Sequence, residues 1–182
     1  MRKRNYVIIF LFIIVVLGVI IFKIYPSPKT SELTNTSTLD ATTQDFSVLL
    51  PYKSKYMGNN SSIININNNL PLSEIKKSFY LNPDTLTVEI NYAEASKNIN
   101  YKKLKQCIIY NSTSNFVLIN NLQTIKINFT DKTFTLSRNS LEKWYGKNLL
   151  ELQNVNNFKS QVQNKLNDEN YVDKFMQEVV DK

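Results

Sequence analysis

Apolar positions along the chain form one long uncharged run near the N-terminus and a series of short clusters after it. The long run covers residues 6–22 and consists almost entirely of Ile, Val, Leu and Phe. Continued to residue 25 as a helix, it reaches about 30 Å, the thickness of the hydrocarbon layer of a bilayer. Lys23 can extend its ammonium group to the membrane surface. The pattern predicts a transmembrane signal anchor over residues 6–25.

The charges before this run predict its orientation. Residues 1–5 contain Arg2, Lys3 and Arg4, and cationic flanks resist translocation. The sequence therefore predicts a cytoplasmic N-terminus and a single-pass protein of the cell membrane, with everything after residue 25 outside the cytoplasm. A cleaved secretory signal is the alternative, although no Ala-x-Ala cleavage motif lies near the run.

Residues 26–45 are rich in Thr and Ser and contain few apolar residues. Such a segment cannot bury enough apolar surface to offset the conformational entropy of folding, so we expect a disordered stalk. From residue 46 onward, apolar and polar positions are interspersed, and the remaining length suits one domain with its own core.

The apolar pattern over residues 46–150 predicts an α+β domain with two β-hairpins and intervening helices. Alternating apolar and polar positions indicate the strands, and apolar positions three or four apart indicate the helices. The expected hairpin arms are residues 77–82 with 85–92 and residues 124–130 with 132–137. The expected helices are residues 62–70 and 101–122, the second with a polar middle, residues 111–115, that is poor helix material.

A further helix is expected after the second hairpin. Asn139 is its predicted N-cap, Glu142 three residues on completes a capping box, and Gly146 closes the helix.

Residues 151–182 are expected to form amphipathic helices, which make a helical C-terminal tail. Apolar residues recur every three or four positions from Leu149 to Leu166, and again from Tyr171 to Val180. This apolar stripe must pack on its own domain, on another copy or on a membrane partner. Packing on its own domain is the default, because an exposed stripe is a liability.

The composition argues against most classes of enzyme that use His, clustered Cys or a glycine-rich loop. The chain has no His, one Cys and three Gly. It therefore lacks Ser/His/Asp and Cys/His nucleophile pairs, His-ligated zinc, and a glycine-rich phosphate loop. Cys107 lies in an apolar run and is expected to be a buried, inert thiol. We expect no cofactor, no metal and no catalytic residue.

The formal net charge of +7 comes from 22 Lys and Arg against 15 Asp and Glu. Four of these cations lie before residue 26, where there is no acid, so the excess is largely a topology signal. The predicted location outside the cytoplasm argues against a nucleic-acid partner.

The turn before the first predicted helix is the leading candidate for a binding surface. Backbone N–H groups at a helix start can bind an anion, and nearby lysines add positive charge. The simpler explanation is a turn and N-cap that only start the helix. The candidate surface comprises Tyr52, Lys53, Lys55, Tyr56, Gly58, Asn59 and Asn60.

Aromatic residues and carboxylates supply two weaker candidates. Tyr and Trp side chains can stack on a glycan or peptide, but most are expected in the core or at its edge. Asp84 with Glu89 or Glu94 could form a glycosidase pair, although nothing in their spacing requires them to converge. The aromatic candidates are Tyr52, Tyr56, Tyr80, Tyr92, Tyr101, Tyr110, Trp144 and Tyr145.

Several motifs, taken in order, resemble a bacterial family, the domain of unknown function 4825. They are residues 52–61, residues 68–72, residues 86–92, residues 110–112 with 116–121, and residues 137–138 with 141–146. The resemblance implies an extracytoplasmic domain of low-GC Gram-positive bacteria that follows a single membrane anchor. Some members are attached to membrane metallopeptidases resembling beta-lactam sensor-transducers. This chain has no HExxH motif, so no peptidase activity carries over, and the family supplies no catalytic residues.

The leading hypothesis is a non-enzymatic extracytoplasmic domain that binds a ligand or protein of the cell envelope, in sensing or regulation. Its partner would be an envelope protein or a cell-wall ligand. The alternative is an envelope hydrolase that uses carboxylates alone, which requires two converging Asp or Glu residues in a cleft.

Overall fold

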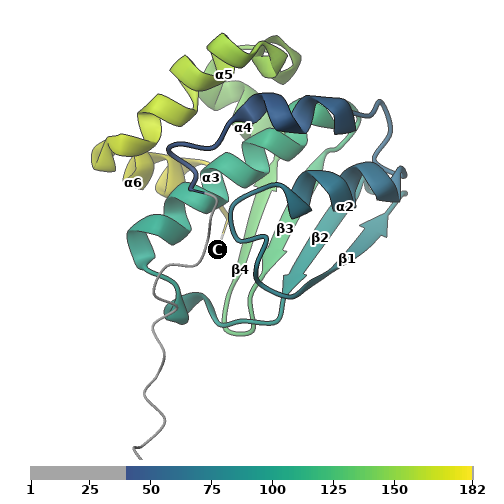
Figure 1. Cartoon of the computed structure of the whole chain (residues 1–182), viewed down its shortest axis with the longest axis horizontal. Coiled ribbons are helices and arrows are strands. Elements are labelled where there is room, and N and C mark those ends of the chain that lie inside the picture. The colour runs from purple at the N-terminus through teal and green to yellow at the C-terminus, as the bar shows by residue number, and fades with distance from the viewer. Residues whose placement is uncertain (1–39, 182) are drawn as a thin grey trace, which may run out of the picture. The chain divides into compact units, whose positions relative to one another are not determined.

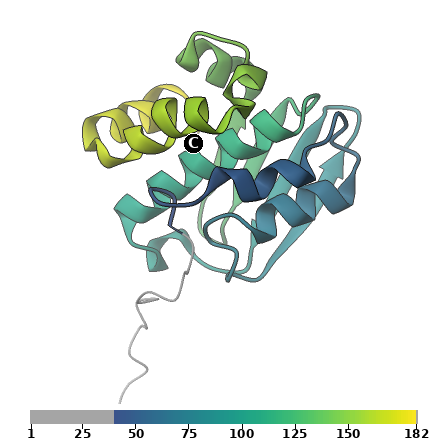
Figure 2. The same ribbon diagram turned by 45° about the horizontal axis from the view of Figure 1, so that its top comes forward.

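The computed structural model describes residues 40–181, which form one four-stranded β-sheet and a set of helices. The strands are β1 (Lys77–Asn82), β2 (Thr87–Tyr92), β3 (Thr124–Asn128) and β4 (Thr133–Ser137), in the spatial order β1-β2-β3-β4. Figures 1 and 2 show η1 (Phe46–Tyr52), α2 (Asn60–Asn68) and α3 (Tyr101–Leu118) together on one face of the sheet. The fold is therefore α+β, built in layers.

Both predicted hairpins are present, since β1 pairs antiparallel with β2, and β3 pairs antiparallel with β4. The contact between the hairpins is parallel, β2 with β3. Parallel neighbours need a long crossover connection, and a short turn, η2 (Ser96–Asn98), followed by α3 supplies it. The two hairpins thus form a single continuous sheet.

The two faces of the sheet have opposite character. Val88 and Ile90 of β2 are buried on the inner face beside Ile125 and Ile127 of β3. On the outer face, Lys126 forms an ion pair of 3.1 Å with Glu89 across the same two strands. The alternation that predicted the strands therefore also places the core on the helix side.

α3 is the central helix of the core, and its polar middle, residues 111–115, is buried. Asn115 and Asn67 of α2 exchange two hydrogen bonds between their side chains, of 3.0 and 3.2 Å. The Asn111 side chain donates to the carbonyl oxygen of Pro71 at 2.7 Å. These partners in the tertiary fold offset the weak helix propensity of the segment. The predicted helix is confirmed, although it ends at Leu118 rather than at residue 122.

Both α2 and the folded unit as a whole begin earlier than the sequence predicts. α2 starts at Asn60, two residues before the expected start, because the Asn59 side chain accepts from the Ser62 backbone N–H at 3.2 Å. The folded unit itself includes residues 40–45, which the sequence predicts to be part of the stalk. Gln163 donates to the carbonyl oxygens of Ala41 and Gln44, at 3.2 and 2.6 Å. The predicted stalk is therefore too long at its C-terminal end.

The C-terminal residues form four short helices that pack on the sheet domain. These are η3 (Leu149–Gln153), α5 (Val155–Gln161), η4 (Gln163–Asn167) and α6 (Glu169–Glu178). Phe158 of α5 stacks on Phe46 at a centroid distance of 3.8 Å and meets Tyr110 of α3 edge-on at 5.3 Å. The apolar stripe thus packs on its own domain, and the chain has no domain boundary at residue 150.

The predicted fold class included a membrane-spanning helix and needs correction. Across residues 40–181, no helix is both long and apolar enough to cross a bilayer. The fold of this part of the chain is an α+β domain with one sheet and helices. The anchor predicted over residues 6–25, its flank at Arg2, Lys3 and Arg4, and most of the stalk lie outside the described residues.

Candidate functional site

An open groove of about 980 Å³ lies between α4 (Arg138–Tyr145) and the C-terminal helices. α4 supplies one wall, and α6 with the ends of α5 and η4 supplies the other. The lining residues are Asn139, Ser140, Lys143, Trp144, Tyr145, Gln161, Lys165, Tyr171, Lys174, Glu178 and Val179. No strand contributes to it, so helix side chains alone determine its chemistry.

Three aromatic residues line this groove, Trp144, Tyr145 and Tyr171, and with Phe175 of α6 they form an aromatic cluster. The Trp144 indole N–H donates to the Tyr171 hydroxyl at 2.9 Å, and the two rings meet edge-on at 5.3 Å. Trp144 also meets Phe175 edge-on at 5.3 Å. The Tyr145 hydroxyl lies 3.2 Å from the Thr113 hydroxyl of α3. The polar atoms of this aromatic cluster are therefore engaged within the protein.

Burial raises the pKa of both tyrosines that line the groove above the ordinary value of a phenol, which already lies well above neutral pH. It raises the pKa of Tyr145 well above the ordinary value for a phenol, and a hydrogen bond with Tyr171 acts in the same direction. Burial likewise raises the pKa of Tyr171. Neither phenol can supply a phenolate base at neutral pH.

The charged side chains of the groove are mainly cationic. Lys143, Lys165 and Lys174 line it together with one carboxylate, Glu178. Lys174 lies 6.0 Å from the centre of the Trp144 ring and 3.9 Å from Glu178. Lys143 and Lys165 are exposed and form no ion pair with any residue of the described part of the chain. The groove therefore has an excess of positive charge.

The start of α4 differs from the predicted one. The Ser137 side chain accepts from the Ser140 backbone N–H at 3.1 Å, so Ser137 is the N-cap and Arg138 is the first helical residue. Asn139 lies inside the helix, and the predicted capping box is wrong. Gly146 ends α4 as expected, with a φ of +67° that favours glycine.

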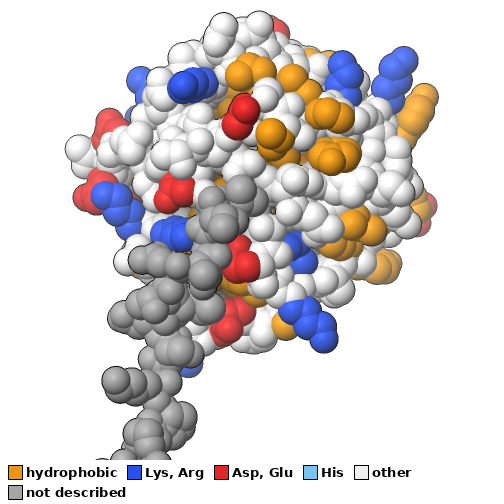
Figure 3. Space-filling view, viewed as in Figure 1, with side chains coloured by type: hydrophobic (Ala, Val, Ile, Leu, Met, Phe, Trp, Pro, Cys, Tyr) orange, Lys and Arg blue, Asp and Glu red, His pale blue; other side chains and the backbone are white. Residues whose placement is uncertain are grey.

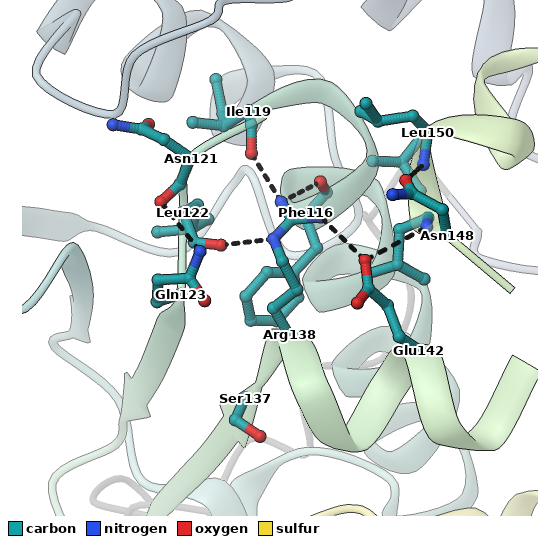
Figure 4. A network of polar contacts seen from close by, with 12 residues as sticks. Phe116, Ile119, Asn121, Leu122, Gln123, Ser137, Arg138, Glu142, Asn148 and Leu150 are labelled. Carbon is teal, nitrogen blue, oxygen red and sulfur yellow. Dashed lines mark hydrogen bonds and ion pairs between the residues drawn. The ribbon is translucent and has the colours of Figure 1, made fainter.

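Arg138 joins α4 to the end of α3, as Figure 4 shows. Its guanidinium donates to the carbonyl oxygens of Leu122 at 2.8 Å, Phe116 at 2.7 Å and Ile119 at 2.8 Å. Glu142 lies 3.7 Å from the guanidinium and accepts from the backbone N–H of Leu149 at 3.5 Å. The buried cation thus joins α4 to the end of α3, and Glu142 links α4 to the start of η3.

Comparison with protein families matches residues 49–140 to a domain of unknown function, DUF4825. The matched segment covers about half of the chain, from η1 to the first residues of α4. The chain belongs to the DUF4825 family. No curated protein and no solved structure matches it. Of the residues that line the groove, only Asn139 and Ser140 fall within the matched segment, so the groove is built mainly by the helices that follow the DUF4825 match.

The binding surface expected from the sequence lies elsewhere on the DUF4825 domain. Its seven residues belong to η1, to the loop after it and to the start of α2, and none of them lines the groove. Two of the backbone N–H groups at the α2 start have partners: Asn60 donates to the carbonyl oxygen of Gly58, and Ser62 donates to the side chain of Asn59. The turn therefore starts a helix, and its use as a binding surface stays a prediction.

This face carries exposed apolar side chains, which Figure 3 shows over η1 and α2. The exposed fraction of Tyr56 is 68%. A second cavity, of about 390 Å³, lies between α2 and β1. Its lining is mostly apolar and consists of Asn60, Ile63, Ile64, Phe79, Tyr80 and Leu81.

The aromatic candidates are distributed between the core and the surface. Tyr92 and Tyr110 are buried in the core, whereas Tyr56, Tyr80 and Tyr101 are exposed. Only Trp144 and Tyr145 reach the groove. Sequence reasoning missed Tyr171, Lys165 and Lys174. The one available signal is spacing, because Tyr171, Lys174 and Glu178 are separated by three and four residues and share a face of α6.

The carboxylates proposed as a glycosidase pair do not come together. Asp84 is exposed in the β1–β2 turn, and Glu89 is paired with Lys126 on the outer face of the sheet. Glu94 follows the other end of β2. It accepts from the backbone N–H of Ala95 at 2.8 Å, which lowers its pKa. Asp131 accepts from the backbone N–H of Ser96 at 2.6 Å, which lowers its pKa too. A general acid needs a raised pKa instead.

Proposed function

We propose that this chain is a membrane-associated protein whose DUF4825 domain lies outside the cytoplasm and binds a ligand or protein of the cell envelope without catalysis. The observation that carries the proposal is the groove between α4 and α6. A volume of about 980 Å³ lies at the upper end of the range of small-molecule sites. Its aromatic cluster and its three lysines are the kinds of side chain that provide contact area and charge in recognition sites.

The chemistry of the groove supports binding rather than catalysis. Glu178 is the one carboxylate among the lining residues, and Lys174 lies beside it. Both groove tyrosines that face the core have raised pKa values. Hydrolysis by carboxylates needs an acid and a base that converge on one bond, and this set of side chains offers one acid at most.

The proposed location rests on the sequence of residues 1–25. Three cations precede an uncharged apolar run, which is the pattern of segments that direct export. The single cysteine fits this location, because an exported protein with one thiol forms no disulfide within its own chain. A role in sensing or regulation of the envelope follows from binding without turnover.

Two measurements test this function. A phosphatase that is active only outside the cytoplasm, fused after residue 182, should be active, and the same fusion without residues 2–25 should be inactive. Separately, the full-length protein, purified in a mild detergent, should be retained reversibly by purified envelope material. The double substitution Lys143→Gln and Lys165→Gln should reduce retention, whereas Lys97→Gln, an exposed lysine outside the groove, should not.

An inactive reporter on a stable fusion would contradict the location. Release of sugar or peptide fragments from the envelope material by the purified protein would contradict binding without catalysis. Equal retention of the wild type and of the groove variant would show that the groove is not the site.

A further inference from the structure

We propose that the groove between α4 and α6 takes an anionic saccharide, a sugar chain that carries carboxylate or phosphate groups. This inference rests on the proposed function and adds the chemical class of the ligand. Three independent features of the groove lead to it: its excess of lysines over carboxylates, its aromatic carbon surface and a lining to which no strand contributes.

The cations require negative charge on the ligand. Lys143, Lys165 and Lys174 come from three different elements, α4, η4 and α6, and line the same cavity. Within residues 40–181, Lys174 is the one of the three that forms an ion pair, with Glu178 at 3.9 Å. Like charges gathered in one groove repel one another, and an anion relieves that repulsion while it accepts charge-assisted hydrogen bonds. Three ammonium groups around an open groove suit several anionic groups along a chain better than one.

The aromatic cluster offers carbon rather than polar atoms. The Trp144 N–H is already bonded to Tyr171, and the Tyr145 hydroxyl pairs with Thr113. What remains for a ligand are ring atoms of half-buried aromatic side chains. Such rings pack against apolar surface while their polar ends stay bonded elsewhere, and the C–H faces of a sugar ring provide apolar surface of this kind.

The walls favour a saccharide over an acidic peptide. An extended peptide is commonly held by main-chain hydrogen bonds to a sheet edge, and no strand lines this groove. Helix interiors use their backbone groups internally. The polar groups left are side chains that can donate to or accept from hydroxyls, namely Asn139, Gln161 and Glu178. Hydroxyl-rich anionic chains match such a set.

The test is titration calorimetry of the full-length protein in mild detergent with an oligogalacturonate. Three comparison probes are the neutral oligogalactose of equal length, an oligoglutamate of equal charge and a single-stranded oligonucleotide. We expect the oligogalacturonate to bind, and the other three to bind about tenfold more weakly or worse. Added salt should weaken the binding.

Matched variants place the binding in the groove. Lys143→Gln combined with Lys165→Gln should weaken oligogalacturonate binding by about tenfold or more, while Lys97→Gln should leave it unchanged. The Trp144 fluorescence of the free and bound protein reports contact with the aromatic cluster, because Trp144 is the single Trp of the chain.

The outcomes separate this inference from the proposed function. Groove-dependent binding of the oligoglutamate or the oligonucleotide in preference to the oligogalacturonate would overturn the saccharide assignment and leave a binding groove in place. Binding of the oligogalacturonate that is insensitive to the double substitution, or no binding of it at all, would also overturn the assignment. Cleavage of the oligogalacturonate would contradict the proposed function itself.

Discussion

Arg138 is the residue on which three segments of the fold depend. It is almost fully buried, and its guanidinium satisfies the carbonyl oxygens that end α3. A buried acceptor that loses its donor costs about 1–3 kcal/mol. The carbonyl oxygens of Phe116 and Leu122 depend on this cation, whereas that of Ile119 also accepts from the N–H of Leu122 at 3.3 Å. The residue stands in a motif that resembles the family, so the motif has a structural explanation that involves no ligand.

Replacing Arg138 with Met should therefore lower the free energy of unfolding by about 3 kcal/mol or more. Chemical denaturation measures this. Lys143→Met is the matched control, since it removes a cation from an exposed position of the same helix and should cost no more than about 0.5 kcal/mol. Equal losses for the two variants would show that the carbonyl oxygens have other partners.

Cys107 gives a second test at the level of one residue. It is buried in α3, and burial raises the pKa of its thiol to about 12. The thiolate is the reactive form, so the native protein should not react with iodoacetamide at pH 8, whereas the unfolded chain should react fully. Because the folded pKa lies above the unfolded one, the thiol favours folding below the unfolded pKa, and this contribution is lost as pH rises toward 12. Rapid labelling of the native protein at pH 8 would contradict the burial.

At the level of elements, the sequence pattern located both hairpins and the long helix because their signals are local. Alternation marks β1 to β4, and it also identifies the buried face of the sheet. The parallel contact of β2 with β3 could not be predicted, since register between segments separated by a helix depends on packing. The apolar period predicts one helical stretch from Leu149 to Leu166, which the structure divides into η3, α5 and η4, because the period continues through the turns between them. The last predicted helix, Tyr171 to Val180, agrees with α6.

Asn154 is the cause of one such break, because its side chain accepts from the backbone N–H groups of Asn156 at 3.0 Å and Asn157 at 3.2 Å. It thereby ends η3 and starts α5. Asn154→Ala should lower the free energy of unfolding by about 1 kcal/mol. Asn156→Ala, two residues on and exposed, should change it by less than about 0.5 kcal/mol. If the two variants were equally stable, the cap would not be what starts α5.

The candidate site illustrates the limit of prediction at this level. A turn with lysines and asparagines can be recognised in a sequence, but the sequence does not show that Gly58 accepts from the N–H of Asn60 and that Asn59 accepts from the N–H of Ser62. The groove depends on α4 meeting α6, and its lining residues are up to 40 positions apart, from Asn139 to Val179. The apolar and polar faces of each helix can be predicted from the sequence, whereas the packing of α4 against α6 cannot.

At the scale of the whole described molecule, the C-terminal helices contact the sheet domain at both ends, and we expect the two parts to unfold as one cooperative unit. Phe158 is fully buried between Phe46 and Tyr110, which belong to the first and the central helices of the domain. At the other end of the helical tail, Asp181 forms two backbone hydrogen bonds with Thr135 of β4, at 3.1 and 2.9 Å.

The chain contains one Trp and one Cys, and they report on the two parts separately. Trp144 lies against α6, and Cys107 lies inside α3. In urea, the change in Trp144 fluorescence and the exposure of Cys107 should share one midpoint, since coincident transitions mark a single cooperative unit.

Phe158→Ala should lower the free energy of unfolding by about 3–5 kcal/mol and move both midpoints together. Leu150→Ala, at a position that is 38% exposed, is the control that should move both midpoints much less. A Trp144 transition that precedes the exposure of Cys107 would mean that the groove can open while the sheet domain stays folded, and ligand binding would then stabilise α6 selectively.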